Sequence, residues 1–336
     1  MTIGVAVIGA GSWGTTVAHL AAHNGPTVLW ARHVDLADTV NATHTNPRYL
    51  ADFALHPSLS ATSSLEEAVS RADVLVMGVP SHGFRETLVA AAPWLRPWVP
   101  VVSLAKGLEE GTRLRMSEVV HDVLPGHPVG VLTGPNLAKE ILAGHAAAAV
   151  LALADAFIAS EVQRCFGTDW FRVYVNHDVV GSELGGVVKN VIAIASGMAD
   201  GLGAGDNARS AVITRGLAEL SRLGVALGGD PRTFAGLAGM GDLIVTCISR
   251  QSRNRHVGEQ LGRGRTIDAI TAEMDQVAEG VRSCRTVLEL ATERGVEMPI
   301  VAEVVAVVHG GRSAAEAYGE LLRRDVRHEH HGLALP

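Results

Sequence analysis

Three glycines near the N-terminus have the spacing of a dinucleotide-binding loop. Gly9, Gly11 and Gly14 follow an apolar stretch and open a stretch with helical character. In such a loop the first glycine makes a tight turn, the second lets the backbone approach a diphosphate, and the third lets the helix pack closely against the strand. The N–H groups and the dipole at the helix N-terminus then favour negative charge. The segment predicts a nicotinamide dinucleotide site, and a glycine-rich structural turn is the alternative.

The end of the second expected strand indicates which nucleotide is bound. NAD-dependent enzymes commonly place a carboxylate about 20 residues beyond the glycines, where it bonds the ribose 2′-hydroxyl. Here Arg32 and His33 occupy this place, and the first carboxylate is Asp35. Arg32 could meet the 2′-phosphate of NADP(H) through charge-assisted hydrogen bonds. We therefore expect use of NADP(H) as well as NAD(H); a solvated surface arginine is the alternative for Arg32.

Two further segments follow expected strands at the edge where open parallel sheets bind their ligands. Lys106 comes just after one apolar strand, and Gly134, Pro135 and Asn136 come after the next. The carboxyl ends of parallel strands lie at one edge, so these residues are expected near the glycine loop.

Lys189 is an isolated charge in an apolar helical stretch. Val187, Val188, Val191 and Ile192 surround it in the sequence. Apolar surroundings disfavour the charged form of a lysine, which could then act as a general base near neutral pH. A lysine that extends from an amphipathic helix into solvent is the alternative.

A polar and basic segment opens another expected helix. Ser252, Arg253, Asn254 and Arg255 supply a hydroxyl, an amide and two guanidinium groups. At a helix start these groups suit a phosphomonoester, because arginine and helix N–H groups both bind phosphate oxygens. A solvated basic cap is the alternative.

The elements that must position these residues follow two different patterns. In the first half, short β-branched or apolar runs alternate with helical stretches, which predicts a doubly wound α/β domain with a parallel sheet. The expected strands cover residues 3–8, 27–30, 74–79, 99–104, 129–132 and 147–153, and the expected helices cover residues 15–23, 65–71, 84–92 and 113–123.

The second half predicts an all-α domain. Long helical stretches are expected at residues 182–199, 208–223, 254–261, 283–294 and 300–309. We expect a dinucleotide-binding domain at 1–178, a helical substrate domain at 179–325 and a polar tail at 326–336. His328, His330 and His331 in this tail are expected to be solvated rather than to bind a metal.

Composition and charge exclude several classes of protein. The chain has 336 residues, of which 47% are hydrophobic and 19% charged, as in globular proteins of two domains. Its net charge of −7 provides no field that would attract nucleic acid or an anionic membrane. The N-terminus lacks the basic region of a signal peptide, and the nine-residue uncharged stretch 146–154 is too short to span a bilayer.

Cysteine usage suits the cytoplasm. Cys165, Cys247 and Cys284 lie far apart without zinc spacing and are expected to be reduced structural thiols. No His, Asp or Glu cluster with ligand spacing accompanies the segments above, so no metal is expected.

Taken together, these segments resemble the bacterial glycerol-3-phosphate dehydrogenase family. The resemblance covers nearly the whole chain to about residue 320. Its most specific parts are the run KNVIAIASGMADGLGAGDNARSAVITRGLAE, which begins at Lys189, and the segments GLAGMGDLIVTC, which begins at Gly236, and QSRNR, which begins at Gln251. Shorter matches are GAGSWGT from Gly9, Lys106–Gly107, Gly134–Pro135 and VAEG from Val277.

The resemblance implies roles for individual residues. Lys189 corresponds to the family's proton acceptor, and Lys106 to the lysine near the reacting carbonyl oxygen and the nicotinamide. The implied substrate contacts are Lys106, Gly134, Asn136, Lys189, Asp242, Ser252, Arg253 and Asn254. The implied cofactor contacts are Gly9, Gly11, Ser12, Trp13, Gly14, Arg32, His33, Tyr49, Lys106, Ala138, Arg253, Val277 and Glu279. Asn136 stands where the family usually has Ser or Thr, and its amide can still form hydrogen bonds.

The implied reaction is hydride transfer between NAD(P)H and the C2 carbonyl of dihydroxyacetone phosphate, giving sn-glycerol 3-phosphate for glycerophospholipid synthesis. Lys189 would move the proton, and Lys106 would stabilise the developing alkoxide. The sequence leaves the oligomeric state open, and a homodimer is one option.

Two alternative functions compete with this reaction. One is a 3-hydroxyacid or 6-phosphogluconate-type dehydrogenase, which the segment QSRNR argues against. The other is a non-catalytic NADPH sensor, which would not need Lys106, Lys189 and Asp242.

Overall fold

The computed structural model describes residues 2–274 and 278–323. Packing contacts divide the chain into two compact units, Met1–Val179 and Val180–Pro336. The expected polar tail with His328, His330 and His331 lies outside the described residues.

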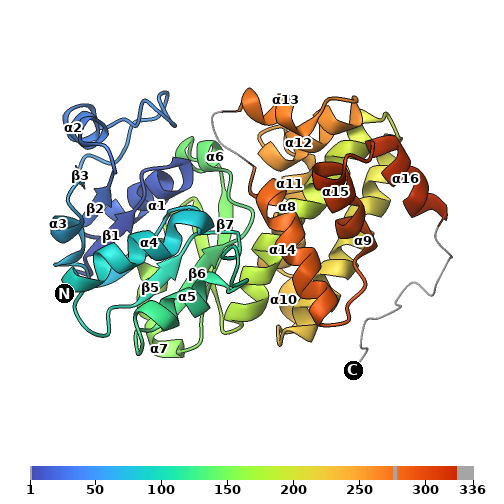
Figure 1. Cartoon of the computed structure of the whole chain (residues 1–336). Helices are drawn as coiled ribbons and strands as arrows, with labels where there is room; N and C mark the ends of the chain where they lie inside the picture. The colour runs from blue at the N-terminus through green and yellow to red at the C-terminus, as the bar shows by residue number, and fades with distance from the viewer. Residues whose placement is uncertain (1, 275–277, 324–336) are drawn as a thin grey trace. The chain divides into compact units, whose positions relative to one another are not determined.

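The first unit contains an eight-stranded sheet (Figure 1). Its strands run in the order β3-β2-β1-β4-β5-β6-β7-β8. The chain moves outward from β1 to β2 and β3 and then returns to β4 on the other side of β1, so the carboxyl end of β1 lies at a topological switch point. The strands are β1 (Val5–Ile8), β2 (Thr27–Trp30), β3 (Leu59–Thr62), β4 (Val74–Met77), β5 (Val101–Ser103), β6 (Val129–Thr133), β7 (Ala147–Leu153) and β8 (Phe171–Asn176).

One pair of strands differs from the expected parallel sheet. β6 and β7 pair in antiparallel fashion, with Thr133 opposite Val150, while β7 and β8 are again parallel. The reason is the connection: between β6 and β7 the only helix is the five-residue α6 (Ala138–Leu142). A parallel pair needs a crossover that carries the chain back along the whole strand, and this short connection instead turns it around.

Helices cover both faces of this sheet. Val5 and Val7 of β1 belong to a core shared with α1, α2, α6 and α7, whereas Ala6 and Ile8 belong to a second core shared with α3, α4 and α5. Because β1 is apolar at every position, it is buried on both faces. The remaining helices of the unit are α1 (Ser12–Ala22), α2 (Val34–Thr43), α3 (Leu65–Val69), α4 (Ser81–Ala91), η1 (Ala92–Trp94), α5 (Met116–Val123) and α7 (Ala156–Arg164).

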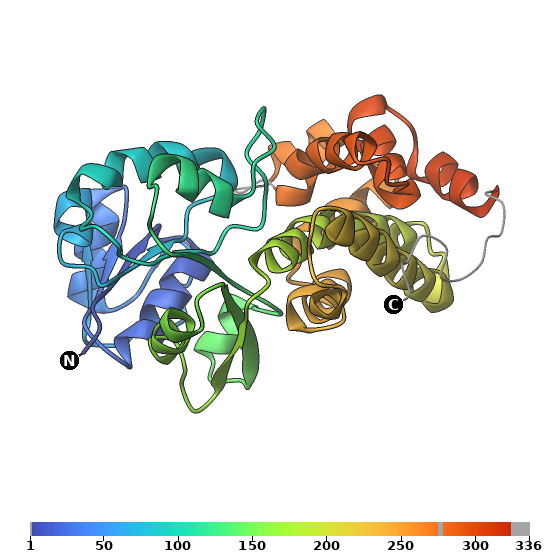
Figure 2. The same cartoon turned by 90° about the horizontal axis from the view of Figure 1, so that it is seen from below.

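The second unit is helical, and its described residues contain no strand (Figure 2). Its elements are α8 (Val179–Gly201), α9 (Gly205–Ala226), α10 (Pro231–Phe234), the π-helical turn η2 (Leu237–Gly241), α11 (Asp242–Ile248), α12 (Arg253–Gly262), α13 (Ile267–Ala272), α14 (Glu279–Glu293), α15 (Pro299–Gly310) and α16 (Ala314–Arg323).

The long helix α8 is the centre of the second unit. Every residue from Gly181 to Ala199 is buried. By length and composition α8 could cross a membrane, unlike the shorter uncharged stretch 146–154. However, 89% of its apolar window is buried inside the fold, and core helices of globular proteins meet the same criterion.

The expected fold class is confirmed: a doubly wound α/β domain precedes a helical region. A strand is found at each of the six expected places, several of them shortened. The edge strands β3 and β8 were not expected, and neither were α2, α6 and α7 in the first unit or α10, α11, α13 and α16 in the second.

Candidate active site

The glycine loop lies at the switch point of the sheet. Gly9 follows β1 with φ of +120°, a conformation that side chains rarely adopt. A Cβ on Gly9 would lie 2.8 Å from the backbone of Gly78, which follows β4, and a Cβ on Gly14 would lie 2.0 Å from the carbonyl oxygen of Gly9. Gly9 is therefore required by packing against the backbone after β4, and Gly14 by packing within the loop itself.

Gly11 has a different environment. Its φ is −72°, and a Cβ placed on it would meet no described atom within 4 Å. It is the N-cap of α1 and makes no side-chain capping bond. The open space beside Gly11 and the N–H groups at the start of α1 fit a diphosphate, which needs close approach to the backbone and donors without a side-chain cap.

The residues expected near the ribose lie at the end of β2 and in the following turns. Arg32 and His33 are exposed, and His33 is the N-cap of α2. Tyr49 is half-buried, and the Arg48 guanidinium carbon lies 5.5 Å from the centre of the Tyr49 ring.

Ser12 lies in the glycine loop as the first residue of α1, where its carbonyl oxygen accepts a hydrogen bond from the Thr16 hydroxyl.

Lys106 and Gly134 are brought together at the carboxyl edge of the sheet. Lys106 Nζ donates a 3.0 Å hydrogen bond to the Gly134 carbonyl oxygen. Gly134 has φ of +128° and packs against Ala149 of β7, where a Cβ would lie 3.2 Å from the Ala149 Cα. The Lys106 ammonium thus lies against the turn that follows β6, as expected for residues at the carboxyl ends of neighbouring parallel strands.

Several buried polar atoms near this edge have no partner among the described residues. They are the hydroxyl of Thr133, both side-chain polar atoms of Asn136 and the indole nitrogen of Trp13. Buried polar groups are normally hydrogen-bonded, so such atoms point to a missing ligand or water. Ala138 follows as the first residue of α6. These side-chain groups fit a bound cofactor whose polar atoms would form hydrogen bonds with them.

In the second unit, Lys189 belongs to a buried polar cluster. Its Nζ lies 2.5 Å from Asp242 Oδ1 and 2.7 Å from Thr246 Oγ1. Lys189, Asp242 and Thr246 are only 5%, 1% and 8% exposed. Asp242 begins α11 and Thr246 lies one turn later, so both side chains reach α8 from the same face of α11. The Thr246 hydroxyl also lies 2.6 Å from the Asp242 carbonyl oxygen.

The expectation that the Lys189 ammonium lies in purely apolar surroundings is wrong. Val188 and Ile192 are buried beside it on α8, but the charged group itself faces a carboxylate. A buried charge is tolerated when a partner of opposite charge and further hydrogen bonds compensate for lost hydration. The cluster therefore stabilises the ammonium form of Lys189.

The polar segment before α12 is divided between two environments. Ser252 is the buried N-cap of α12 and accepts a hydrogen bond from the Arg255 N–H, whereas Arg253 is exposed. Asn254 is buried: its Nδ2 donates to Asn190 Oδ1 over 3.0 Å, and its Oδ1 accepts from the Gly280 N–H over 2.9 Å. Asn254 thus links α8, α12 and α14, and Arg253 is the residue of this segment that is accessible to a ligand.

Close helix packing brings α12 next to α8. A Cβ on Gly197 of α8 would lie 2.1 Å from the Arg255 carbonyl oxygen, and a Cβ on Gly258 of α12 would lie 2.0 Å from the Ile194 carbonyl oxygen. Only glycine permits this approach. It places Asn254 beside Asn190, the residue that directly follows Lys189 in the sequence.

The last cofactor segment is partly described. Glu279 is half-buried in the first turn of α14, and Val277 lies outside the described residues.

Three residues of these sites were not singled out from the sequence. Thr246 is four residues after Asp242, a spacing that places both on one helix face and could have identified it. Asn190 is next to Lys189, and Asn46 hydrogen-bonds the glycine loop through Ala10. The Asn190 and Asn46 contacts join residues distant in sequence and carry no local signal.

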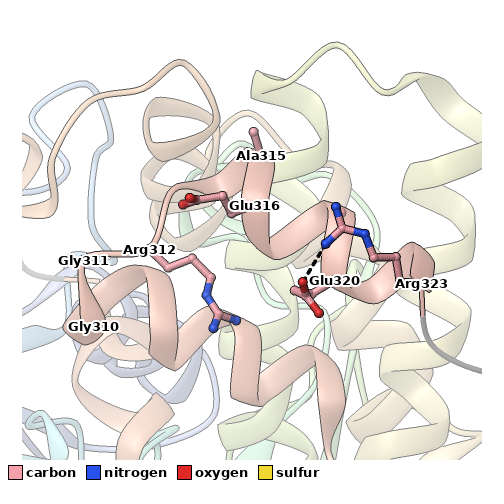
Figure 3. A pocket seen from close by; sticks show the side chains of 8 residues that line it. Gly310, Gly311, Arg312, Ala315, Glu316, Glu320 and Arg323 are labelled. Carbon is pink, nitrogen blue, oxygen red and sulfur yellow. Dashed lines mark hydrogen bonds and ion pairs between the residues drawn. The ribbon is translucent and has the colours of Figure 1, made fainter.

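Other features are separate from these residues. A hollow lies at the turn between α15 and α16, where Arg323 pairs with Glu320 (Figure 3). None of the predicted site residues lines it.

All three cysteines are free and buried, and burial raises the pKa of the Cys247 thiol to about 12. The described residues contain no group of three or more His, Cys, Asp or Glu that could hold a metal ion.

Comparison with known proteins identifies the family. Sequence models for the N-terminus and the C-terminus of NAD-dependent glycerol-3-phosphate dehydrogenase match residues 4–159 and 178–319. Proteins named glycerol-3-phosphate dehydrogenase [NAD(P)+] from Sphingopyxis alaskensis and Mycobacterium avium are both 56% identical to this chain, covering 98% of it and 99% and 96% of their own lengths. The crystal structure of glycerol-3-phosphate dehydrogenase from Coxiella burnetii is 36% identical, with a TM-score of 0.92 over 96% of this chain and 99% of the other. The chain belongs to the NAD-dependent glycerol-3-phosphate dehydrogenase family.

Proposed function

We propose that the protein is a glycerol-3-phosphate dehydrogenase that interconverts dihydroxyacetone phosphate and sn-glycerol 3-phosphate with NADP(H) or NAD(H). The observation that carries this proposal is the buried cluster of Lys189, Asp242 and Thr246. A buried lysine paired with a carboxylate is costly in folding, and such groups concentrate at sites of proton transfer. The names of the relatives at 56% identity point to the same reaction.

The cofactor is proposed to lie on the first unit. Its diphosphate would bind at Gly11 and the start of α1, and the 2′-phosphate of NADP(H) would meet Arg32 and His33. Tyr49, Trp13 and Ala138 would complete the contacts in this unit. The family resemblance implies further cofactor contacts at Arg253, Val277 and Glu279. The open space at Gly11 and the exposed Arg32 support this assignment.

The substrate phosphate is proposed to meet Arg253 and Ser252 at the start of α12. Arg253 is exposed, and arginine binds phosphate oxygens in a bidentate manner. The N–H groups of the first turn of α12 favour the same negative charge. Asn254 would act here mainly by holding the helix start in place, because its side-chain atoms already pair with Asn190 and Gly280.

Proton transfer is assigned to Lys189. The nicotinamide supplies the hydride that reduces the C2 carbonyl when the cofactor is bound. Lys189 Nζ gives its proton to the carbonyl oxygen as that oxygen gains negative charge, and it takes the proton back in the oxidative direction. Asp242 keeps the ammonium form of Lys189 available, and Thr246 fixes the position of Nζ.

Lys106 is proposed to stabilise the developing alkoxide. A lysine donates through three N–H groups, and one of them is directed to the Gly134 carbonyl oxygen. That bond holds the charge at the carboxyl edge of the sheet, where Gly134 and Asn136 would contact the substrate. A positive charge fixed before the reaction costs no reorganisation in the transition state.

We further propose that residues 1–178 form the cofactor domain and residues 179–325 the substrate domain, and that the enzyme acts in the cytoplasm to supply glycerophospholipid synthesis. The free cysteines are consistent with a reducing compartment.

A direct assay tests the function. Purified protein is mixed with dihydroxyacetone phosphate and NADPH or NADH, and cofactor oxidation is followed by absorbance. Oxidation that depends on the phosphorylated ketone is expected. Turnover of 3-hydroxyacids or 6-phosphogluconate without turnover of dihydroxyacetone phosphate would instead support the rival dehydrogenase class, and cofactor binding without any turnover would support a sensor.

A further inference from the structure

We infer that Asn46 is a positioning residue that holds the diphosphate-binding loop in the orientation needed for the cofactor. The inference rests on the proposed NAD(P)-dependent function and adds to it a residue outside the glycine pattern. Asn46 lies between α2 and β3, 36 residues from the loop that it contacts.

The Asn46 side chain is fully buried and donates two hydrogen bonds. Its Nδ2 lies 2.9 Å from the carbonyl oxygen of Ala10, between the first two glycines, and 2.8 Å from the hydroxyl of Thr15 in α1. A carbonyl oxygen can only accept, so the contact with Ala10 fixes which end of the amide carries the N–H groups. One side chain therefore joins the loop to the helix that follows it.

The bond to Ala10 determines where the next N–H group points. In a trans peptide the carbonyl of one residue and the N–H of the next point in opposite directions. With the Ala10 carbonyl directed to Asn46, the Gly11 N–H is directed away from Asn46. Gly11 is the residue whose missing side chain leaves open space, so this N–H belongs to the peptide expected to face the diphosphate.

The backbone of Asn46 connects the same loop to a second part of the cofactor site. Its carbonyl oxygen accepts hydrogen bonds from the N–H groups of Tyr49 and Leu50, at 3.2 and 2.8 Å. These bonds close the turn that carries Arg48 and Tyr49. Asn46 thus fixes this turn and the glycine loop relative to each other.

The burial of Asn46 is only partly compensated, which argues for a role beyond packing. Its Oδ1 is buried and accepts no hydrogen bond from any residue that the structure describes. A buried oxygen without a partner destabilises a fold, and an apolar side chain would avoid that cost. The amide N–H groups are the part of Asn46 that the loop requires.

The test measures cofactor binding directly. The dissociation constants of NADPH and of ADP-ribose, which carries the diphosphate without the nicotinamide, are determined by titration for wild type and Asn46→Ala. Both constants are expected to rise about tenfold or more, because the loop loses its anchor. The kcat at saturating NADPH and the KM for dihydroxyacetone phosphate are expected to stay close to wild type.

A matched variant separates positioning from general destabilisation. Asn24 also donates from its amide to carbonyl oxygens of the first unit, namely those of Leu20, Cys165 and Gly167, but at the other end of α1. Asn24→Ala is expected to lower the Tm without changing the affinity for NADPH or ADP-ribose. Thr15→Val keeps the Ala10 bond and is expected to bind NADPH almost normally.

Several results would overturn the inference. These are an unchanged NADPH affinity in folded Asn46→Ala, a loss confined to NADPH with ADP-ribose unaffected, or an equal loss in Asn24→Ala. If Asn46→Ala does not fold, Asn46→Leu keeps a similar side-chain shape without an N–H group or a charge and is held to the same criterion. If neither variant folds, Asn46 is required for folding, and the positioning role is wrong. Wild-type protein that binds neither NADPH nor NADH would overturn the proposed function itself.

Discussion

Lys189 and Asp242 are 53 residues apart in the sequence, and they form a buried ion pair with 2.5 Å between Nζ and Oδ1. The pair connects α8 with α11, and Thr246 lies within hydrogen-bond distance of both side chains. Removing one partner leaves the other charge buried and unpaired, so a variant of either residue should affect both the stability of the fold and the proposed proton transfer.

The first prediction separates these two effects. Lys189→Met leaves the Asp242 carboxylate buried without its partner and should lower the free energy of unfolding by about 3–5 kcal/mol. Turnover should fall by at least about 10²–10⁴-fold, because the proton donor is lost. The double variant Lys189→Met, Asp242→Asn removes the unpaired charge, so it should regain stability but not turnover. Denaturant unfolding and initial rates measure the two effects, and a folded Lys189→Met protein within about threefold of wild-type turnover would refute the proton-transfer role.

Sequence patterns predicted the first unit best where the chemistry is local. Gly9, Gly11 and Gly14 lie in one short segment directly after β1, so strand, turn and helix could be inferred together. The inner strands are continuous apolar runs and were found for that reason. β3 and β8 lie at the edges of the sheet. In β8, buried Phe171 and Val173 alternate with exposed side chains, so no apolar run marks the strand.

The environment of Lys189 could not be predicted in the same way. Its neighbours in sequence are apolar, and this local pattern gave the wrong expectation for the ammonium group. The carboxylate arrives from α11 through tertiary packing, which periodicity does not reveal. Asn46 is a similar case, since its partner Ala10 is 36 residues away.

The second prediction concerns the three glycines. Gly11→Ala should leave the Tm unchanged, because its Cβ meets no described atom within 4 Å, but should raise the dissociation constant of NADPH at least about tenfold by occupying the diphosphate space. Gly14→Ala should instead destabilise the fold by about 1–3 kcal/mol, since its Cβ would overlap the Gly9 carbonyl oxygen. Gly83→Ala in α4 also has open space and serves as the control, with normal affinity and an equal or slightly higher Tm because alanine favours a helix more than glycine does. Equal NADPH affinity in Gly11→Ala and Gly83→Ala would place the diphosphate elsewhere.

The third prediction concerns cofactor choice. Arg32→Ala should raise the KM for NADPH about tenfold or more, through loss of a charge-assisted contact with the 2′-phosphate, and should leave NADH nearly unaffected. Arg71→Ala is the matched control, because Arg71 is also exposed but lies before β4, at the opposite edge of the sheet. The ratio of kcat/KM for the two cofactors is the measurement, and an unchanged ratio in Arg32→Ala would show that Arg32 is a surface arginine.

The fourth prediction is a pH dependence of stability. Burial, together with the nearby imidazoles of His23 and His56, lowers the pKa of His19 to about 4. The geometry agrees, because His19 Nδ1 accepts a hydrogen bond from the His56 N–H and must be unprotonated to do so. An unfolded histidine takes up its proton near pH 6.5, so the unfolded state binds more protons between about pH 6.5 and 4.

The free energy of unfolding should therefore decrease as the pH falls through this range, with a contribution of at most about 1.4 kcal/mol per pH unit from His19. His19→Gln should reduce the dependence, because the neutral amide takes up no proton in either state. Denaturant unfolding at pH 7, 6 and 5 measures the slopes. Identical slopes for His19→Gln and wild type would show that His19 does not cause the effect.

The fifth prediction locates the substrate phosphate. Arg253 is exposed at the start of α12, whereas the Asn254 side chain is engaged by Asn190 and Gly280, so Arg253 is the better probe. Arg253→Gln should lower kcat/KM for dihydroxyacetone phosphate by about one to two orders of magnitude, as expected for loss of one charge-assisted contact. At saturating NADPH, where a lost cofactor contact of Arg253 does not limit the rate, it should have much less effect on unphosphorylated dihydroxyacetone, which has no phosphate to lose. Arg263→Gln, at the other end of α12, removes a surface pair with Glu259 and should leave both substrates unaffected. If Arg253→Gln weakened the use of both ketones equally, the phosphate would have to bind at another place, because a group that recognises phosphate must discriminate between them.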